Sequence, residues 1–275
     1  MGDQRSASVM RSVLFVPGSR PERFAKALAA GADAVIIDLE DAVESEHKAS
    51  ARDHIREFAS ASPDNTFLIR VNDATTPWFD DDLALCASLK TVTAVVLPKA
   101  ETRAQVDQAA QTGKAVLPIV ESARGVLALV ELAASPDVMR LSFGSLDMML
   151  ELGITPDTPA AHTLLEHVRC QILLHSTAQG LAQPLDGVFP DFSDLPGLQK
   201  HALHIKHMGF AGMLCIHPKQ IAPIHEAFMP STEEQDWARR VVEIADRTGS
   251  FAFQVDGKMV DVPVIQRARQ ILALG

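Results

Sequence analysis

The sequence predicts a parallel (β/α)8 barrel, a TIM barrel, followed by a short helical C-terminal tail. Eight short apolar runs alternate with segments of helical pattern along the 275 residues, a length that suits one large α/β core. The runs lack the alternation of half-exposed strands, so both faces of each strand are expected to be covered. An open doubly wound sheet shares this pattern, but eight runs joined by helices favour the barrel.

The expected strands are the runs rich in β-branched and aliphatic residues. They cover Val13–Val16, Ala34–Leu39, Phe67–Val71, Val92–Leu97, Ala115–Val120, Arg140–Phe143, Leu185–Phe189 and Gly212–Ile216. The expected helices between and after them cover Pro21–Ala30, Glu46–Ala59, Glu101–Gln111, Gly125–Ala134, Ala160–Gln179, Leu198–Met208 and Pro218–Phe228. We place the barrel at residues 1–230 and the tail at residues 231–275, and we expect the tail to pack on a neighbouring subunit.

The charge and the cysteines restrict the class of protein. The net charge of −10 disfavours nucleic acid or an anionic membrane as a partner, since both need a basic surface. No apolar run approaches the ~20 residues of a membrane span, and the first residues lack the apolar stretch of a signal peptide. The three cysteines are scattered, which is typical of reduced thiols in a cytoplasmic protein.

Acidic side chains gather at the ends of the expected strands. The second run ends in Asp38, Glu40 and Asp41, the fifth is followed by Glu121, and the sixth is followed by Asp147. The carboxyl ends of all barrel strands meet at one mouth, so these carboxylates are expected to converge. Their repulsion would be costly unless a cation lies between them. A hard dication with oxygen ligands, Mg²⁺, resolves this.

Each of these carboxylates, taken singly, has a simpler interpretation as a helix N-cap or a first-turn charge. Their collection at several strand ends favours the metal site. Arg70, at the end of the third run, offers a planar fork for a carboxylate. Gly144 and Ser145 open a helix, where backbone amides can hold an anion.

Seven segments, in this order, resemble one known family. They are RSVLFVPGSRPERFAKALAAGADAVIIDLEDAV, IRVN, LPKAET, LPIVESARG, FGSLDM, LCIHPKQI and DGKMVDVP. Each is weak alone, but the ordered set resembles the HpcH/HpaI aldolase and citrate lyase β-subunit (CitE-like) family over nearly the whole chain. The resemblance implies a TIM barrel that binds Mg²⁺ and cleaves or forms C–C bonds between a 2-oxo acid and an enolate, commonly that of a CoA thioester.

The resemblance also implies roles for individual residues. It makes Glu121 and Asp147 the metal ligands and Arg70 the residue that binds the acid. It places the DLED cluster, with Glu40 as a catalytic candidate, near water ligands of the metal. The sequence departs from many relatives at Leu146, where an acidic residue is common; this bears on the substrate more than on the reaction type.

The resemblance gives the tail a catalytic residue. In CoA-lyase relatives an aspartate of a GxMxDxP segment reaches the active site of a neighbouring subunit, and Asp261 matches it. The alternative makes Asp261 the N-cap of a helix that begins before Pro263. The first interpretation predicts a homotrimer or another homo-oligomer.

The predicted function is that of a Mg²⁺-dependent carbon–carbon lyase. It would cleave a short 2-hydroxy-acyl thioester of the citryl-, malyl- or citramalyl-CoA type to an acyl-CoA and a 2-oxo acid. The thioester could also be carried by an acyl carrier protein. Two alternatives are a CoA-independent 2-oxo acid aldolase and a non-catalytic barrel subunit. A Schiff base at Lys99 is disfavoured by the acidic cluster, and His201, His204 and His207 do not share one helical face as metal ligands would.

Overall fold

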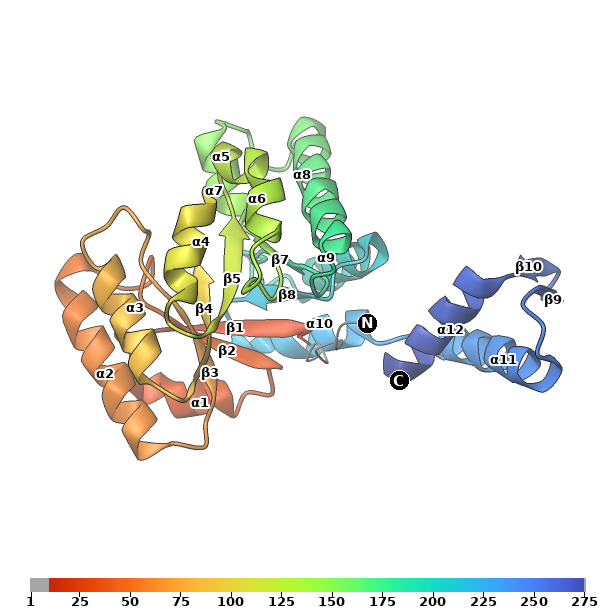
Figure 1. Cartoon of the computed structure of the whole chain (residues 1–275), viewed down its shortest axis with the longest axis horizontal. Coiled ribbons are helices and arrows are strands. Elements are labelled where there is room, and N and C mark those ends of the chain that lie inside the picture. The colour runs from red at the N-terminus through yellow and green to blue at the C-terminus, as the bar shows by residue number, and fades with distance from the viewer. Residues whose placement is uncertain (1–9, 275) are drawn as a thin grey trace. The chain divides into compact units, whose positions relative to one another are not determined.

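The computed structural model describes residues 10–274 and divides into two compact units, Met1–His225 and Glu226–Gly275. The first unit is a closed barrel of eight parallel strands in sequence order, surrounded by helices (Figure 1). The strands are β1 Ser12–Pro17, β2 Ala34–Asp38, β3 Phe67–Arg70, β4 Val92–Leu97, β5 Ala115–Val120, β6 Ser142–Phe143, β7 Leu185–Asp186 and β8 Gly212–Cys215. The predicted fold class is therefore confirmed, and each predicted strand is present.

The apolar runs form strands because both of their faces are buried. Val13, Ile36, Leu68, Leu117 and Leu214 belong to one buried cluster contributed by different barrel strands. Their neighbours in sequence, such as those on either side of Ile36, are also almost fully buried. A strand covered on both faces needs no polar alternation, which is the pattern that the sequence shows.

The helices of the barrel unit mostly follow the predicted segments. They are α1 Phe24–Leu28, α2 Lys48–Ala61, α3 Phe79–Ser88, α4 Arg103–Ala110, α5 Ala123–Leu127, α6 Leu129–Ala133, α7 Ser145–Glu151, α8 Pro159–Ala178, α9 Leu195–Met208 and α10 Ile221–Phe228. The predicted helix Gly125–Ala134 is broken at Ala128 into α5 and α6. Helix α3 is not among the predicted segments, and of α7 only the start at Gly144 and Ser145 is predicted.

The pairing between β6 and β7 is the shortest in the barrel, with Ser142 and Leu185 as the one pair in register. A side chain from α8 reinforces this seam. Arg169 lies with its guanidinium carbon 5.2 Å from the ring centre of Phe143 in β6, and its Nε donates to Asp186 in β7 at 2.9 Å. Arg169 thus connects the two strands from outside the barrel.

Asp186 is fully buried and has two cationic or polar partners. Besides Arg169, the Nε2 atom of His201 lies 2.9 Å from its carboxylate. Burial opposes the ionisation of Asp186, yet hydrogen bonds from His201 and Arg169 hold the pKa of this carboxyl below its usual value. His204 contacts a different carboxylate, that of Glu166, at 3.0 Å. These contacts give two of the three recurring histidines structural roles in the α8 and α9 layer.

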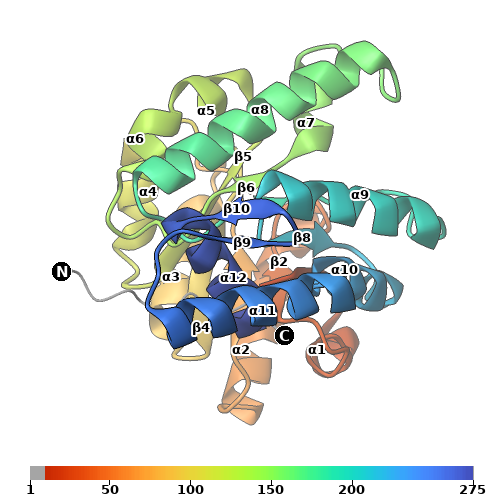
Figure 2. The same ribbon diagram turned by 90° about the vertical axis from the view of Figure 1, so that its right-hand side faces the viewer.

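The second unit contains two helices and a hairpin. Helices α11 Thr232–Thr248 and α12 Val262–Leu274 pack together, and strands β9 Phe253–Val255 and β10 Lys258–Val260 form the antiparallel connection between them (Figures 1 and 2). Asp256 and Gly257, both with positive φ, make the hairpin turn. In residues 10–274 no helix combines the length and apolarity that a membrane crossing requires.

Candidate active site

A cavity of about 350 Å³ opens at the carboxyl ends of the barrel strands. Every strand except β4 contributes a wall residue near its carboxyl end or just after it. The polar wall residues are Asp38, Asp41, Arg70, Glu121, Ser145 and Asp147. The strand ends therefore bring together the carboxylates and the arginine that the sequence predicts at the mouth, and they share one enclosed space.

The register between β2 and β3 fixes the first ion pair of this cavity. Asp38 and Arg70 are paired at the last position of the β2–β3 ladder. The Nε and Nη2 atoms of Arg70 donate to the two carboxylate oxygens of Asp38 at 2.7 and 2.6 Å. Burial would lower the pKa of Arg70, but the charges of Asp38, Glu40 and Asp41 raise it. The guanidinium is permanently charged, with Nη1 as the nitrogen that Asp38 does not use.

Glu40 lies behind the cavity wall and connects Arg70 to Lys99. Its Oε2 atom is 3.0 Å from Nη1 of Arg70, and its Oε1 atom accepts a hydrogen bond from Nζ of Lys99 at 2.6 Å. Burial raises the pKa of Glu40 in spite of these two cations. The loop that carries Glu40 is held by Lys48, whose Nζ donates to the carbonyl oxygens of Leu39 and Glu40 at 2.7 and 2.6 Å.

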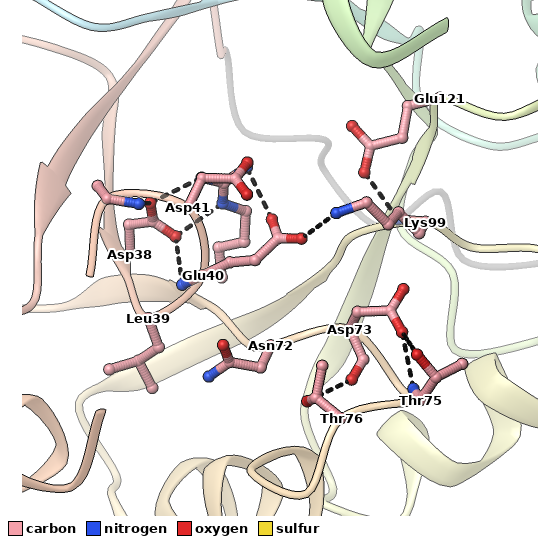
Figure 3. Close-up of polar contacts among 12 residues, drawn as sticks. Asp38, Leu39, Glu40, Asp41, Asn72, Asp73, Thr75, Thr76, Lys99 and Glu121 are labelled. Atoms are coloured by element: carbon pink, nitrogen blue, oxygen red, sulfur yellow. Dashed lines mark hydrogen bonds and ion pairs between the residues drawn. The ribbon is translucent and has the colours of Figure 1, made fainter. Parts of the chain in front are cut away.

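Lys99 holds two carboxylates with two different groups (Figure 3). Its ammonium contacts Glu40, whereas its backbone nitrogen donates to Oε1 of Glu121 at 2.7 Å. The φ angle of Lys99 is 45°, in the left-handed region that non-glycine residues rarely adopt. This backbone conformation directs the amide that follows β4 towards the end of β5. A hydrogen bond to Glu40 raises the pKa of Lys99 despite burial, so the amine stays protonated and unsuited to a Schiff base.

Glu121 is an energetically unfavourable carboxylate in this environment. It is 5% exposed. Burial first, and then the negative charges of Glu40 and Asp147, raise the pKa of Glu121 to about 8. A group whose ionised form is so disfavoured would be stabilised by a cation in the cavity.

Asp147 and Gly144 bring β6 and α7 to the same wall as Glu121. Asp147 lies in the first turn of α7, and Gly144 is the residue before that helix. A Cβ atom on Gly144 would lie 2.3 Å from Oε2 of Glu121. The amide of Gly144 already donates to the carbonyl of Val120 at 3.0 Å. Gly144 therefore allows the backbone to pack directly against Glu121. Because its amide is already engaged, the predicted anion-binding role stays a prediction for the amide of Ser145.

The change Gly144→Ala is expected to reduce kcat/KM by about 100-fold, because the new methyl group displaces Glu121 from its position. The control is Gly153→Ala. Gly153 has a φ of 64°, and a methyl group added there would meet no atom within 4 Å, so this change strains the backbone without touching the cavity. We expect it to lower the melting temperature but not kcat/KM. Equal kinetics of Gly144→Ala and wild type would contradict the close packing on Glu121.

The carboxylates of this cavity fit a hard dication. Glu121 and Asp147 offer oxygen ligands from two neighbouring strand ends, and oxygen ligands suit Mg²⁺. Across residues 10–274, no group of three or more His, Cys, Asp or Glu side chains is arranged to hold a metal ion. A Mg²⁺ ion bound by Glu121 and Asp147 would therefore take its remaining ligands from water and substrate, as this ion commonly does.

The predicted site residues fall into two groups. Arg70, Glu121, Gly144, Ser145 and Asp147 all line the cavity, and Glu40 lies directly behind it. Asp261 belongs to the second unit, where its side chain accepts a hydrogen bond from the amide of Val264 at 3.4 Å and its carbonyl accepts one from Ile265. Asp261 thus caps α12, as one of its two interpretations predicts, and its part in catalysis stays a prediction.

Sequence reasoning missed two lysines that position the acidic residues. Lys48 is 5% exposed although it is charged, and it lies 5.4 Å from the ring centre of Trp78. The sequence suggests Lys99 only as a nucleophile, and not as a partner of Glu40 and Glu121. One feature of the sequence indicates this role of Lys99. The lysine directly follows the end of a strand that carries no acidic residue, so its ammonium is available to the carboxylates of the other strand ends.

Comparison with known proteins places the chain among lyases. Residues 11–218 match the model of the HpcH/HpaI aldolase/citrate lyase family. A citrate lyase subunit beta-like protein of Mycobacterium tuberculosis is 40% identical over 94% of this chain and 93% of its own length. A (3S)-malyl-CoA thioesterase of Cereibacter sphaeroides is 36% identical over 97% of this chain and 95% of its own.

The fold comparison agrees with the sequence comparison. The crystal structure of protein CitE from M. tuberculosis in complex with magnesium, acetoacetate and coenzyme A superposes with a TM-score of 0.87, at 38% identity, over 97% of this chain and 98% of that chain. The matched family model spans most of the barrel, and the relatives match over nearly the whole length. The chain therefore belongs to the HpcH/HpaI aldolase/citrate lyase family.

Proposed function

We propose that this protein is a Mg²⁺-dependent carbon–carbon lyase that cleaves a short hydroxy-acyl thioester of the citryl-, malyl- or citramalyl-CoA type, whose hydroxyl group is on the carbon next to the thioester α-carbon. The products would be an acyl-CoA and a 2-oxo acid. The observation that carries the proposal is the convergence of Glu121, Asp147 and Arg70 on one cavity. The magnesium, acetoacetate and coenzyme A bound to the M. tuberculosis relative support it.

Different residues of the cavity would bind the two ends of the substrate. Glu121 and Asp147 would hold Mg²⁺, which as a Lewis acid stabilises negative charge on the oxygen of the carbon that becomes the keto carbon. Arg70 would bind the carboxylate of the acid half through Nη1, the nitrogen that does not contact Asp38; in this structure Nη1 contacts Glu40 and Asp41 at 3.0 and 3.3 Å, so the substrate would share it with these carboxylates. Glu40 and Lys99 lie behind these groups, and we assign them the positioning of Arg70 and Glu121.

The reaction moves one proton and breaks one bond. The hydroxyl group loses its proton, the bond between the hydroxyl-bearing carbon and the thioester α-carbon breaks, and the α-carbon gains a proton. The last step needs a proton donor near the thioester. Asp261 is our candidate for this donor, supplied by the tail of a neighbouring subunit, because the barrel mouth contributes its own carboxylates to the metal and to Arg70.

The direct test is an assay of the purified protein against citryl-, malyl- and citramalyl-CoA, with and without Mg²⁺. We expect 2-oxo acid release from at least one thioester and its loss on chelation with EDTA. Activity that is unchanged by EDTA would contradict the metal-dependent mechanism. Cleavage of the free acids but not of the thioesters would favour a CoA-independent aldolase.

Thioester hydrolysis is a second candidate, favoured by the 36% identity with the (3S)-malyl-CoA thioesterase. The products distinguish the two reactions. A lyase releases a 2-oxo acid and keeps the thioester bond intact, whereas a thioesterase releases free coenzyme A and the hydroxy acid. Detection of free thiol alone during turnover of malyl-CoA would favour hydrolysis.

The proposal extends to the assembly and the compartment. We propose a homotrimer or another homo-oligomer, because the tail carries Asp261 in a unit separate from the barrel. We also propose a cytoplasmic location, supported by the free thiols Cys86, Cys170 and Cys215. The boundary at residues 230 and 231 stays a prediction, and the two compact units of the structure divide between His225 and Glu226.

Complementation tests the role of Asp261. Mixing Asp261→Ala with Glu121→Ala protein is expected to restore part of the activity, because a hybrid oligomer contains a site with both groups intact. Differently tagged chains confirm that subunits exchange. Hybrids that form and stay inactive, together with full activity of Asp261→Ala alone, would show that the aspartate only caps α12.

A further inference from the structure

The hydroxyl group of Ser145 is a hydrogen-bond donor that faces the cavity without a partner from the protein. Ser145 begins α7 and lines the cavity, although the residue is only 9% exposed. Among residues 10–274 the structure gives its side chain no hydrogen-bond partner. Burying a hydroxyl group that stays unpaired is costly, so this group is available to a substrate atom in the cavity.

The other side chains of the cavity wall give Ser145 a distinct chemical role. In the part of the chain that the structure describes, this wall has four carboxylates, and its side-chain donors are Arg70 and Ser145. Arg70 ends β3 and is tied to Asp38 of β2, whereas Ser145 follows β6, three strands further round the ring. Ser145 is thus the neutral donor on the side of the cavity that carries Asp147.

The backbone around Ser145 fixes the position of its hydroxyl group. The amide of the preceding Gly144 donates to the carbonyl of Val120 at 3.0 Å, which ties the start of α7 to the end of β5. A Cβ atom on Gly187, which follows β7, would lie 2.7 Å from the carbonyl oxygen of Phe143 and 3.5 Å from Oγ of Ser145. Because Gly187 has no side chain, the end of β7 packs against the turn that carries Ser145. A donor held in this way needs no rearrangement when charge develops near it.

Cleavage of the proposed substrate changes the charge on two of its oxygen atoms. The oxygen of the carbon that becomes the keto carbon would lie on the side of Glu121 and Asp147. The electron pair of the broken C–C bond moves onto the thioester, whose carbonyl oxygen becomes the oxygen of an enolate. The wall carboxylates repel this charge, and the apolar wall side chains cannot offset it. The enolate oxygen therefore needs a hydrogen-bond donor of its own.

We propose that Ser145 donates a hydrogen bond from Oγ to the thioester oxygen and stabilises the enolate that C–C cleavage forms. The proton stays on Oγ throughout, and a separate group protonates the α-carbon. This inference rests on the proposed function and assigns a catalytic residue to the acyl half of the substrate. It also orients the substrate, with the acid half towards Arg70 and the thioester towards the ends of β6 and β7.

The test measures turnover and metal binding separately in two variants of Ser145. Ser145→Ala removes the hydroxyl group, whereas Ser145→Cys keeps a side chain of similar shape whose thiol is a weak donor. The control is Ser60→Ala, which removes an exposed hydroxyl group on α2 that donates to the carbonyl of Arg56 at 2.8 Å. Each protein is assayed for 2-oxo acid release from the thioester that the wild type cleaves, and calorimetry measures Mg²⁺ binding.

Both Ser145 variants are expected to lower kcat about 100-fold. The KM should change little, because the charge on the thioester oxygen develops only in the transition state. Mg²⁺ binding stays as in the wild type, and Ser60→Ala matches the wild type in every measurement. Wild-type kcat in either Ser145 variant, or loss of Mg²⁺ binding in both, overturns the assignment.

The assay also distinguishes a failure of this inference from a failure of the proposed function. A wild type that hydrolyses the thioester instead of cleaving the C–C bond places the charge on the same carbonyl oxygen. In that case the lyase proposal fails, and a fall in kcat for thiol release in both variants still supports Ser145 as the donor. A wild type that acts on no thioester overturns both proposals.

Discussion

Replacing Glu121 by glutamine is expected to abolish turnover and, in magnesium-free buffer, to raise the melting temperature. Burial and neighbouring carboxylates raise the pKa of Glu121 from its ordinary value of 4.5 to about 8. The folded state therefore binds the proton more strongly than the unfolded state, and its stability falls as the pH rises from about 4.5 to about 8. Glutamine keeps the shape and removes the charge, so this destabilisation disappears together with the metal ligand.

Calorimetric titration with Mg²⁺ and thermal unfolding at pH 8 test this pair of effects. Glu121→Gln and Asp147→Ala should both lose measurable Mg²⁺ binding, and kcat should fall by at least about 1,000-fold, or ~4 kcal/mol. Glu131→Ala, a change in an exposed carboxylate on α6, is the control and should match wild type. Unchanged Mg²⁺ binding in both variants would remove Glu121 and Asp147 as ligands.

Arg70→Lys is expected to lower kcat/KM by about 100-fold although the charge is kept. The guanidinium holds Asp38 with Nε and Nη2 while Nη1 stays directed to Glu40 and Asp41. The single ammonium of lysine cannot occupy all three positions. We expect both a higher KM for the 2-oxo acid in the condensation direction and a lower kcat, because the substrate carboxylate and the Asp38 pair depend on the same side chain.

The Asp38→Asn variant distinguishes the binding of the substrate carboxylate by Arg70 from the ion pair between Arg70 and Asp38. It weakens the ion pair with Arg70 but leaves the guanidinium present, so we expect a smaller rise in the KM for the 2-oxo acid than in Arg70→Lys. Circular dichroism and thermal melting check that each variant folds, since breaking a buried ion pair destabilises a protein. Wild-type kinetics for the acid in Arg70→Lys would show that Arg70 does not bind its carboxylate.

The strands could be predicted because a strand that is buried on both faces requires a continuous run of apolar residues, and such runs are visible in the sequence. The short β6 and β7 are predicted longer, at Arg140–Phe143 and Leu185–Phe189, because apolar composition extends beyond the hydrogen-bonded pairs. Helix α3 begins with Phe79 followed by three aspartates. This acidic start interrupts the spacing of apolar residues by which a helix is recognised in a sequence. Helix α7 has seven residues, too few for a periodic pattern to be recognised.

The sequence located the acidic residues of the site but not their partners. Parallel topology alone brings Glu121 and Asp147 to one mouth, so their convergence followed from counting strands. The left-handed backbone of Lys99 could not be predicted, because lysine seldom adopts it and no glycine marks the turn. The two hydrogen bonds from Arg70 to Asp38 depend on the β2–β3 register, which the sequence does not specify.

The reinforced seam between β6 and β7 makes the closure of this barrel uneven. A closed sheet has no edge strand, yet one interval of this ring has a single pair in register, two backbone hydrogen bonds from Leu185 and Ala182 to Leu141 and Met139, and the Arg169–Asp186 contact behind it. Local opening of a protein starts where few backbone bonds have to break. We therefore expect local opening of the barrel to begin between β6 and β7, whose ends lead into Gly144 and Gly187 at the cavity wall.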